Sequence, residues 1–298
     1  MEIRATNCGI AGNSTRCMIV LYLLLALNAP ADLIVDFGSA KDFTFLDVGL
    51  NPGNNLLIQK GTFSGNVGWA GGAGTRIDLN ATLDGDLYHA AGPTVRYRRG
   101  GTLLGADLEV SSMQGFIDDV DFAVAQFGSF TRDIYLGSID QTGGLTIDRT
   151  DEYTVVDLDS FSMSSGTLTL NGQADDVFYI RVSDVFELSN VDVVVNGTDA
   201  SRVFFIYDGT SDLTFEGGGF QGNIIAPDAA VLLTKIDGFS GSVISGNGFT
   251  ISGKTKNIVI APPPPVPEPA VLSLIGLFGG GGIFVRRIFK CRTFSASA

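Results

Sequence analysis

The chain has 298 residues, of which 45% are hydrophobic, and carries a formal net charge of −13 at pH 7. A chain of this size can bury one large core. Its acidic balance disfavours contact with phosphate backbones, so nucleic acid is not an expected partner. The sequence has one histidine, and its three cysteines lie near the two ends of the chain, which argues against a zinc site built from nitrogen and sulfur ligands.

Residues 1–31 have the layout of a secretory signal peptide. Two arginines precede or flank the apolar run 18–27, and small residues at 29–31 allow cleavage between Ala31 and Asp32. A first transmembrane helix is the alternative, but the run is shorter than the roughly 17–25 residues that cross a bilayer. We therefore expect residues 32–261 to form one exported domain.

A short motif recurs four times in this expected domain: a large apolar residue, any residue, Gly, a small polar residue and an aliphatic residue. Its copies are FSGNV (63–67), LDGDL (83–87), FQGNI (220–224) and FSGSV (239–243). Alternate residues of a strand share a face, so Phe63 and Val67 can point inward with a tight glycine bend between them. The motif predicts coils of a β-solenoid, and ordinary β-sandwich strands are the alternative.

One segment has helical periodicity. Apolar residues recur at intervals of three and four from Val110 to Phe127. This spacing predicts one long helix over about 107–128, packed along the side of the strands. A coiled coil with a partner is the alternative, although the pattern covers fewer than three heptads.

The order of these parts resembles the ice-binding-like and choice-of-anchor A surface proteins. Two glycine-spaced coils and a lone helix are followed by VFYIRV, VDVVVNG and GNIIAPDAAV, and the resemblance spans roughly residues 45–253. It implies a mainly β fold, a right-handed β-solenoid (β-helix) with one long helix packed alongside. It does not settle an activity, because one fold can serve several binding roles.

Side chains suited to catalysis are sparse. His89 follows a coil motif and is interpreted as a turn residue, and no GxSxG nucleophile elbow is present. Carboxylates are abundant and are the ligands that calcium prefers, but no calcium-binding repeat accompanies them. The acidic groups that stand out are Asp118, Asp119 and Asp121, Asp157 and Asp159, and Asp175 and Asp176. We expect no catalytic residue, no cofactor and no metal.

Threonines give one more candidate surface. Thr167 and Thr169 lie two residues apart and would share one strand face, as an ice-binding surface requires. Thr146, Thr210 and Thr214 are further candidates for such an array.

The end of the chain has three ordered features. A proline-rich linker over 262–269 precedes an uncharged apolar stretch at 270–285, expected to be a transmembrane helix, and a basic tail at 286–298, which the positive-inside bias places in the cytoplasm. This order is similar to the PEP-CTERM protein-sorting signal of Gram-negative bacteria. The residues that carry the resemblance are Val266, Pro267, Glu268, Pro269, Arg286 and Arg287.

The PEP-CTERM resemblance implies an exosortase-type membrane protease as a partner. It also implies transient anchoring in the inner membrane through the C-terminal helix, and final delivery to the cell surface or the extracellular space. The interrupted basic cluster and the extra tail TFSASA depart from the family pattern and bear on the efficiency of cleavage.

The leading functional hypothesis is a non-enzymatic structural or adhesive protein of extracellular matrix or biofilm. It would bind polysaccharide, an exopolysaccharide for example, or another repeating surface. One alternative is an ice-binding protein. The other is a polysaccharide-active β-helix enzyme, whose carboxylates would have to act in pairs.

A first prediction concerns sorting. Changing Pro267, Glu268 and Pro269 together to Ala should leave export intact and block processing at the C-terminus, because the protease would lose its recognition motif. Mass spectrometry of the mature protein, with cell fractionation, checks this. Identical mature mass and location for the parent and the variant would contradict the sorting hypothesis.

Overall fold

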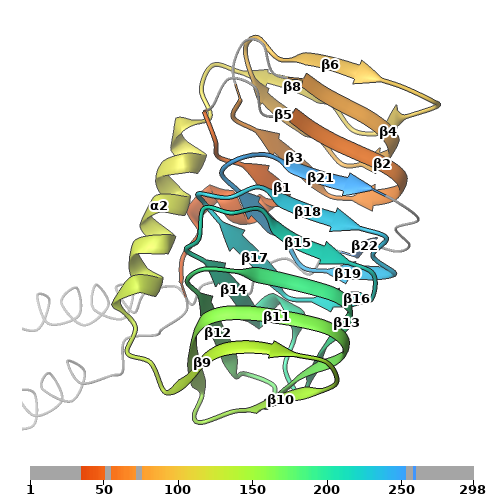
Figure 1. Ribbon diagram of the computed structural model, residues 1–298. Coiled ribbons are helices and arrows are strands. Elements are labelled where there is room, and N and C mark those ends of the chain that lie inside the picture. Colours follow the sequence, from red (N-terminus) through yellow and green to blue (C-terminus); the bar gives the residue numbers. More distant parts are fainter. Residues whose placement is uncertain (1–34, 51–54, 72–75, 253–257, 260–298) are drawn as a thin grey trace, which may run out of the picture. The chain divides into compact units, whose positions relative to one another are not determined.

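The computed structural model describes residues 35–50, 55–71, 76–252 and 258–259. Within these ranges parallel strands stack into coils, and one long helix runs along the side of the stack (Figure 1). The fold is mainly β, a β-solenoid with one helix alongside, as the glycine-spaced motif and the lone helical pattern predict. Each coil has three faces, which we name A, B and C.

Face A is the face that the helix covers. Its strands, in stacking order, are β8 (Asp107–Val110), β5 (Leu87–Ala90), β3 (Asn66–Trp69), β1 (Phe43–Asp47), β20 (Val243–Ser245), β17 (Asn223–Ala226), β14 (Val203–Tyr207), β12 (Val177–Val182) and the start of β11 (Tyr153–Asn171). Every residue of β1 and of β14 is buried. These strands have the core on one side and other protein on the opposite side, which explains their continuous apolar runs.

Faces B and C have one side open to solvent. In stacking order, face B holds β6 (Thr94–Tyr97), β4 (Arg76–Asp84), β2 (Asn55–Ser64), β21 (Phe249–Ser252), β18 (Val231–Thr234), β15 (Leu213–Glu216), β13 (Phe186–Asn196), β11 and β9 (Ile134–Gln141). Face C holds β7 (Thr102–Leu103), β22 (Ile258–Val259), β19 (Gly238–Ser240), β16 (Gly219–Gln221) and β10 (Leu145–Asp148), with the second parts of the long strands β4, β2, β13 and β11.

The chain enters this stack in its middle. From η1 (Gly38–Asp42) and β1 it proceeds to one end at β8, and α2 (Gln114–Ser129) then returns along face A toward the other end (Figure 1). Strands β9 to β22, with the short η2 (Ala200–Arg202), lead back to the middle. There β20 pairs with β1, at Phe45↔Val243, and β21 pairs with β2, at Ile58↔Ile251. We call this junction of the first and last coils the seam.

Large apolar side chains from successive coils fill the interior. Phe220 and Phe239 pair across adjacent strands with their rings stacked at 5.5 Å, and Phe186 packs against Phe215 at 5.1 Å. Burying each such side chain stabilises the fold by about 1.5–3 kcal/mol. The stack is therefore held by backbone pairing around a continuous apolar core.

The glycines of the repeated motif lie at the corner between faces C and A. A Cβ added to Gly241 would lie 1.9 Å from the carbonyl oxygen of Gly222, and one added to Gly85 would lie 2.2 Å from that of Gly65. Gly222 and Gly241 also have φ of +139° and +146°, which residues with a side chain rarely adopt. The predicted tight bends are confirmed, and the bend is tight because one coil rests directly on the backbone of the next.

In three of the four motif copies, the small polar residue that follows the glycine binds the next coil. The Oδ1 atom of Asn66 accepts a hydrogen bond from the backbone N–H of Asp86 at 3.1 Å, and the Oδ1 atom of Asn223 accepts one from that of Ser242 at 3.1 Å. These side chains satisfy backbone donors that the corner would otherwise leave without partners. The motif thus encodes both the bend and its hydrogen bonding.

The helix begins later than its apolar pattern predicts. It spans Gln114–Ser129, whereas the predicted range was about 107–128, because Asp107–Val110 form β8 and pair with β5. Gly105 precedes β8 at the same corner as the motif glycines, and a Cβ there would lie 2.3 Å from the carbonyl oxygen of Gly85. One more coil therefore forms before the chain can leave the stack.

Aromatic side chains fix α2 to face A. Phe116 packs edge-on against Phe43 at 4.9 Å, and Phe127 contacts Tyr179 at 5.4 Å. Arg181 on β12 then donates hydrogen bonds from Nη1 to the carbonyl oxygens of residues 127 and 130, at 2.9 and 3.1 Å. A cation at these carbonyls satisfies acceptors that a helix C-terminus leaves open and favours its dipole.

Asp47 is a buried carboxyl group at the seam. It ends β1, in register with Trp69 on one side and Ser245 on the other. Its Oδ1 accepts a hydrogen bond from the backbone N–H of Gly248 at 2.9 Å, and its Oδ2 has no hydrogen-bond partner among the described residues. Burial raises the pKa of Asp47 to about 7, against the opposing effect of backbone N–H groups of Gly248 and Gly49.

The corner glycines give a prediction about stability. Gly241→Ala should lower the free energy of unfolding by about 3 kcal/mol or more, because the new Cβ would overlap a neighbouring carbonyl group. Gly238→Ala is the matched control, since a Cβ there meets nothing within 4 Å. Thermal melts of both variants check this, and equal melting temperatures would contradict the close contact between coils. Gly222→Val should behave like Gly241→Ala.

Asp47 gives a prediction about pH. Below the unfolded-state pKa of about 3.9 the carboxyl is neutral in both states, and above it the unfolded chain ionises first. The stability that the neutral buried group contributes is therefore lost as the pH rises through its folded pKa of about 7. The loss is up to about 4 kcal/mol, since each tenfold change in proton affinity is worth about 1.4 kcal/mol.

Asp47→Asn keeps an oxygen acceptor and carries no charge, so this variant should lack that loss. Denaturant midpoints measured from pH 4 to pH 8 test the difference between parent and variant, which should grow in favour of the variant as the pH rises. A difference that does not change with pH would contradict the role assigned to Asp47.

Candidate binding surface

Two of the three faces could contact a partner, because α2 covers face A. Face C is interrupted: Gly219 and Gly238 occupy outward, in-register positions of β16 and β19 and contribute no side chain. Nearby, the carboxylate of Asp192 accepts a hydrogen bond from the backbone N–H of Gly219 at 2.7 Å. Face B has an outward side chain at each of the corresponding positions, so it is the more continuous surface.

The middle of face B presents a neutral array of outward side chains, which we call the face-B patch. Its first column runs in register across four strands and its second column lies two residues further along two of them. The first column is Leu57, Thr250, Leu232 and Thr214, and the second is Ser252 and Thr234. Neighbours in a column are about 4.7–4.9 Å apart and the columns are about 6.6 Å apart, which are the ordinary strand dimensions.

The patch is held rigidly from below. Inward residues alternate with it along the same strands, and Ile58, Ile251 and Leu233 are at most 1% exposed. The hydroxyl groups of Thr234 and Ser252 lie 3.4 Å apart, close enough for one to donate to the other. Because the strands are paired on both sides, the outward side chains have little freedom to change their spacing.

Charged residues mark the limits of the patch. At one end Asp78 lies in register with Leu57, and at the other Glu187 lies in register with Thr214. Glu216 lies beside Thr234 and forms an ion pair with Lys235 at 2.5 Å. The neutral surface therefore extends over β2, β21, β18 and β15.

The threonines selected from the sequence do not form one surface. Thr167 and Thr169 do share a strand face, and Thr146 lies in register with Thr169, but all three are on face C. Thr214 belongs to the face-B patch. Thr210 lies in the connection after β14.

Most of the patch was not identified from the sequence. Leu57 and Thr250 are neighbours in the stack although they come from the first and last coils of the chain. The alternation in FTIS (249–252) shows which residues point outward, whereas the three apolar residues at the start of VLLT (231–234) leave the direction of Leu232 and Leu233 open. It does not show which strands are adjacent, and adjacency is what assembles the columns.

His89 does not lie in a turn, as its sequence context suggested. It lies within β5, is 7% exposed, and its ring nitrogens are 2.8 Å from the Ala90 carbonyl oxygen and 3.0 Å from the Asp107 carboxylate. Asp107 is on β8, so the histidine links two adjacent coils. This position gives the imidazole a structural role.

Most of the acidic residues singled out from the sequence are engaged in structural contacts, whereas Asp121 is exposed on α2. Asp157 accepts a hydrogen bond from Arg181 Nε at 2.6 Å and Asp159 accepts one from the Tyr135 hydroxyl at 2.6 Å, so this pair serves two separate contacts. Others bind partners in the same way: Asp118 with Gln114, Asp119 with Ser39, Asp175 with Arg202 and Asp176 with Arg149. Within the described residues, no group of three or more His, Cys, Asp or Glu side chains could hold a metal ion.

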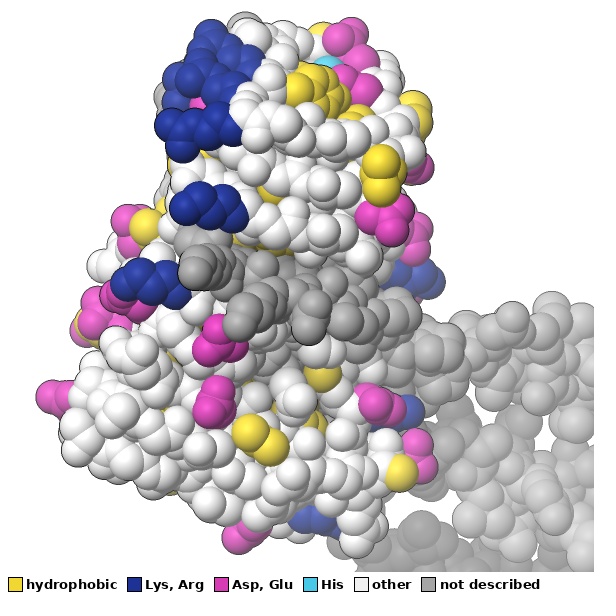
Figure 2. Space-filling model, turned by 90° about the vertical axis from the view of Figure 1, so that its right-hand side faces the viewer, with side chains coloured by type: hydrophobic (Ala, Val, Ile, Leu, Met, Phe, Trp, Pro, Cys, Tyr) yellow, Lys and Arg dark blue, Asp and Glu magenta, His cyan; other side chains and the backbone are white. Residues whose placement is uncertain are grey.

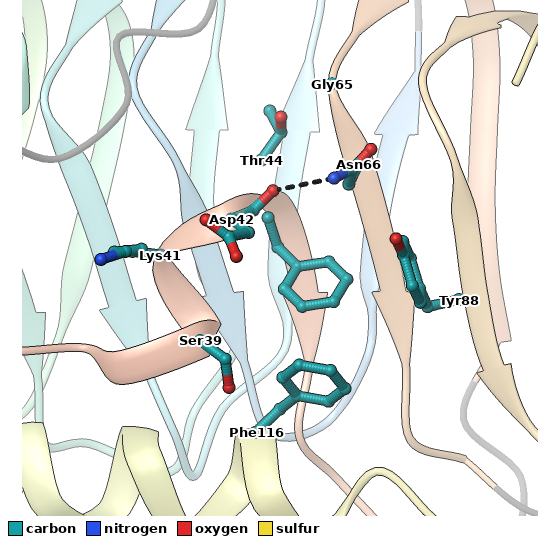
Figure 3. A pocket seen from close by; sticks show the side chains of 9 residues that line it. Ser39, Lys41, Asp42, Thr44, Gly65, Asn66, Tyr88 and Phe116 are labelled. Carbon is teal, nitrogen blue, oxygen red and sulfur yellow. Dashed lines mark hydrogen bonds between the residues drawn. The ribbon is translucent and has the colours of Figure 1, made fainter. Parts of the chain in front are cut away.

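A separate pocket of about 430 Å³ lies where α2 and η1 meet the first coils (Figure 3). It is lined by Ser39, Lys41, Asp42, Phe43, Thr44, Gly65, Asn66, Tyr88 and Phe116. Asn66 Nδ2 donates to the Asp42 carbonyl oxygen at 3.2 Å, and the Ser39 hydroxyl donates to Asp119. The lining combines aromatic rings with one carboxylate and one ammonium group, and it contains no histidine or cysteine.

The residues expected to direct export and sorting lie outside the described part of the chain. These are Ala31 and Asp32 at the signal cleavage site, and Val266, Pro267, Glu268, Pro269, Arg286 and Arg287 in the sorting motif. The expected transmembrane stretch 270–285 also falls there. Among the described helices, none is long and apolar enough to cross a membrane.

Comparison with known families agrees with the solenoid architecture. Residues 28–256 match the family described as "Putative Ice-binding-like adhesive domain", which is well over half of the chain. The chain belongs to this family. No curated protein matches the sequence.

Solved structures of ice-binding proteins have a similar fold. One from an Antarctic biological consortium is 15% identical, with a TM-score of 0.50, over 76% of this chain and 90% of that one. One from the Antarctic ascomycete Antarctomyces psychrotrophicus is 18% identical, with a TM-score of 0.49, over 76% and 98%. A glycosylated one from an Arctic yeast is 19% identical, with a TM-score of 0.46, over 80% and 100%.

At these identities the similarity concerns the fold alone. The family is described as ice-binding-like and adhesive, which are non-enzymatic kinds of protein. The description of the family as ice-binding-like favours the ice-binding alternative over the polysaccharide hypothesis that the sequence suggested first.

Proposed function

We propose that the protein is a non-enzymatic surface-binding protein whose face-B patch binds ice. The observation that carries the proposal is the neutral, in-register array of Leu57, Thr250, Leu232 and Thr214 on adjacent parallel strands. Such an array repeats at a fixed spacing, which suits a crystalline surface better than a small molecule. The membership in an ice-binding-like adhesive family supports it.

The chemistry of the patch fits an ordered water surface. Threonine and serine hydroxyls can both donate and accept hydrogen bonds, and the leucine and threonine methyl groups add apolar area. No charged side chain belongs to the patch, so binding does not require removing water from an ion. The rigid strands below it mean that little conformational entropy is lost on contact.

A catalytic function has less support. The best candidate carboxylate pair, Asp157 and Asp159, is engaged by Arg181 and Tyr135. A general acid and a nucleophile or base would have to face one substrate bond. These two side chains instead hold separate structural contacts on strands and helix.

We also propose that the protein is exported and sorted to the cell surface through an exosortase-type protease. The support is the order of the PEP motif, the apolar stretch 270–285 and the basic residues that follow. A surface location would bring the face-B patch to ice outside the cell.

The decisive experiment compares two faces of the same protein. The double variant Thr214→Tyr, Thr250→Tyr should abolish ice shaping and thermal hysteresis, because bulky rings would disrupt the flat array. Tyr is well tolerated in strands, so folding should persist. Thr167→Tyr, Thr169→Tyr places the same substitutions on face C and should keep the activity.

Each outcome has a definite meaning. Loss of activity only in the face-C variant would place the ice-binding surface there, and no hysteresis in the parent would refute ice binding. Retention of the parent on immobilised neutral polysaccharide, lost in the face-B variant, would instead favour glycan adhesion by the same patch. Circular dichroism spectra of all variants confirm that the fold is retained.

A further inference from the structure

Four arginines gather at the end of the solenoid where face B stops. Arg76 lies on β4, Arg96 lies on β6, the last strand of the face, and Arg98 and Arg99 follow directly in the next turn. All four are exposed. Figure 2 shows a group of Lys and Arg side chains on one side of the upper end of the molecule, with acidic side chains on the other side of that end and scattered over the rest of the face.

One buried carboxylate organises this arginine cluster. Asp78 lies in register with Arg96, its side chain is 8% exposed, and it accepts the Nε of Arg76 at 2.7 Å. Arg98 Nε lies 3.6 Å from the other carboxylate oxygen. A single negative charge therefore orients two guanidinium groups, while Arg96 and Arg99 form no ion pair within the described residues, so the cluster keeps a positive surplus.

The backbone at Arg99 provides an independent observation. The N–H of Gly101 donates to the carbonyl oxygen of Arg98 at 2.8 Å, and the two residues between them, Arg99 and Gly100, have φ of +51° and +83°. This is a type I′ turn, in which Asn followed by Gly is strongly preferred. Arginine is less favoured than asparagine at this position, and the Arg99 guanidinium forms no ion pair within the described residues, so it is available to contact a partner.

We propose that the arginine cluster binds the carboxylate groups of an acidic polysaccharide. The guanidinium fork matches a carboxylate in a bidentate geometry. The chain as a whole carries a net charge of −13, so any polyanion is repelled beyond the cluster, and duplex DNA, with one charge per about 1.7 Å of its axis, is repelled more strongly than a chain with one charge per sugar. A uronate chain carries its charges one sugar apart and needs only a short cationic site at one point along its length.

This site is distinct from the proposed ice-binding patch and does not depend on it. The patch lies on β2, β21, β18 and β15, whereas the cluster lies on β4, β6 and the turn that follows. Because β6 is the end of face B, a polymer can approach the arginines from the end of the stack. Both surfaces could be occupied at once, which suits an adhesive domain.

The test measures retention of the full chain on immobilised polygalacturonate, with dextran as the neutral reference. The parent should bind polygalacturonate, lose binding steeply as salt is raised, and ignore dextran. Arg96→Gln, Arg99→Asn should weaken binding by at least about tenfold, since two charge-assisted contacts are lost. The same variant should melt at an equal or higher temperature, because Asn suits the I′ turn.

A matched control separates the cluster from overall charge. Lys41→Gln, Arg132→Gln removes the same charge at exposed positions away from the cluster, in η1 and after α2, and should change binding by less than about twofold. Equal loss in both variants, or no loss in the cluster variant, would overturn the proposal. Stronger binding to phosphatidylglycerol vesicles or to duplex DNA than to polygalacturonate would also overturn it. Ice shaping should be unchanged in the cluster variant, so the two proposals can fail separately.

Discussion

The hydrogen bonding between parallel strands is the interaction on which the rest of this structure depends. It sets one distance between successive coils, and side chains at in-register positions of neighbouring coils are therefore separated by the same distance. Inside, the rings of Phe220 and Phe239 stack in register; outside, Thr214 and Leu232 occupy neighbouring positions of one column. At the corners the same distance leaves no room for a side chain, which is why Gly241 rests on the carbonyl group of Gly222. Core, corners and binding surface are three results of a single spacing.

The seam requires pairing between strands that are far apart in the sequence. On one side, β1 and β2 pair with β20 and β21, which follow about two hundred residues later in the chain. Phe45 and Ile58 therefore have no strand partner on that side until these last strands are in place. Contacts between residues so far apart in sequence close large loops and slow folding. The buried carboxyl of Asp47 lies at this junction and accepts a hydrogen bond from Gly248. The middle of the stack is thus completed last, although it begins with the first strand.

The sequence was most informative wherever the structure is local. The spacing of Phe63, Gly65 and Val67 predicts the whole corner: the glycine bend and the inward side chains on either side of it. The predicted start of α2 was wrong, because Val110 fits a helical pattern and also the alternation of β8. The columns of face B could not be predicted, since Leu57 and Thr250 become neighbours only through the path of the whole chain. Thr167 and Thr214 were grouped by residue type, and only the position of the corners assigns them to different faces.

The entry of the chain in the middle of the stack has a mechanical consequence. Phe43, where β1 begins, and Val259, where β22 ends, belong to adjacent coils, because β20 pairs with β1 and β22 pairs with β2. A tether joined to the chain after Val259 would therefore be attached to the middle of the solenoid and not to one of its ends. Pulled by such a tether, the column could turn across the direction of the force. The two ends of the stack, including the end with the arginine cluster, would then project on either side of the attachment point.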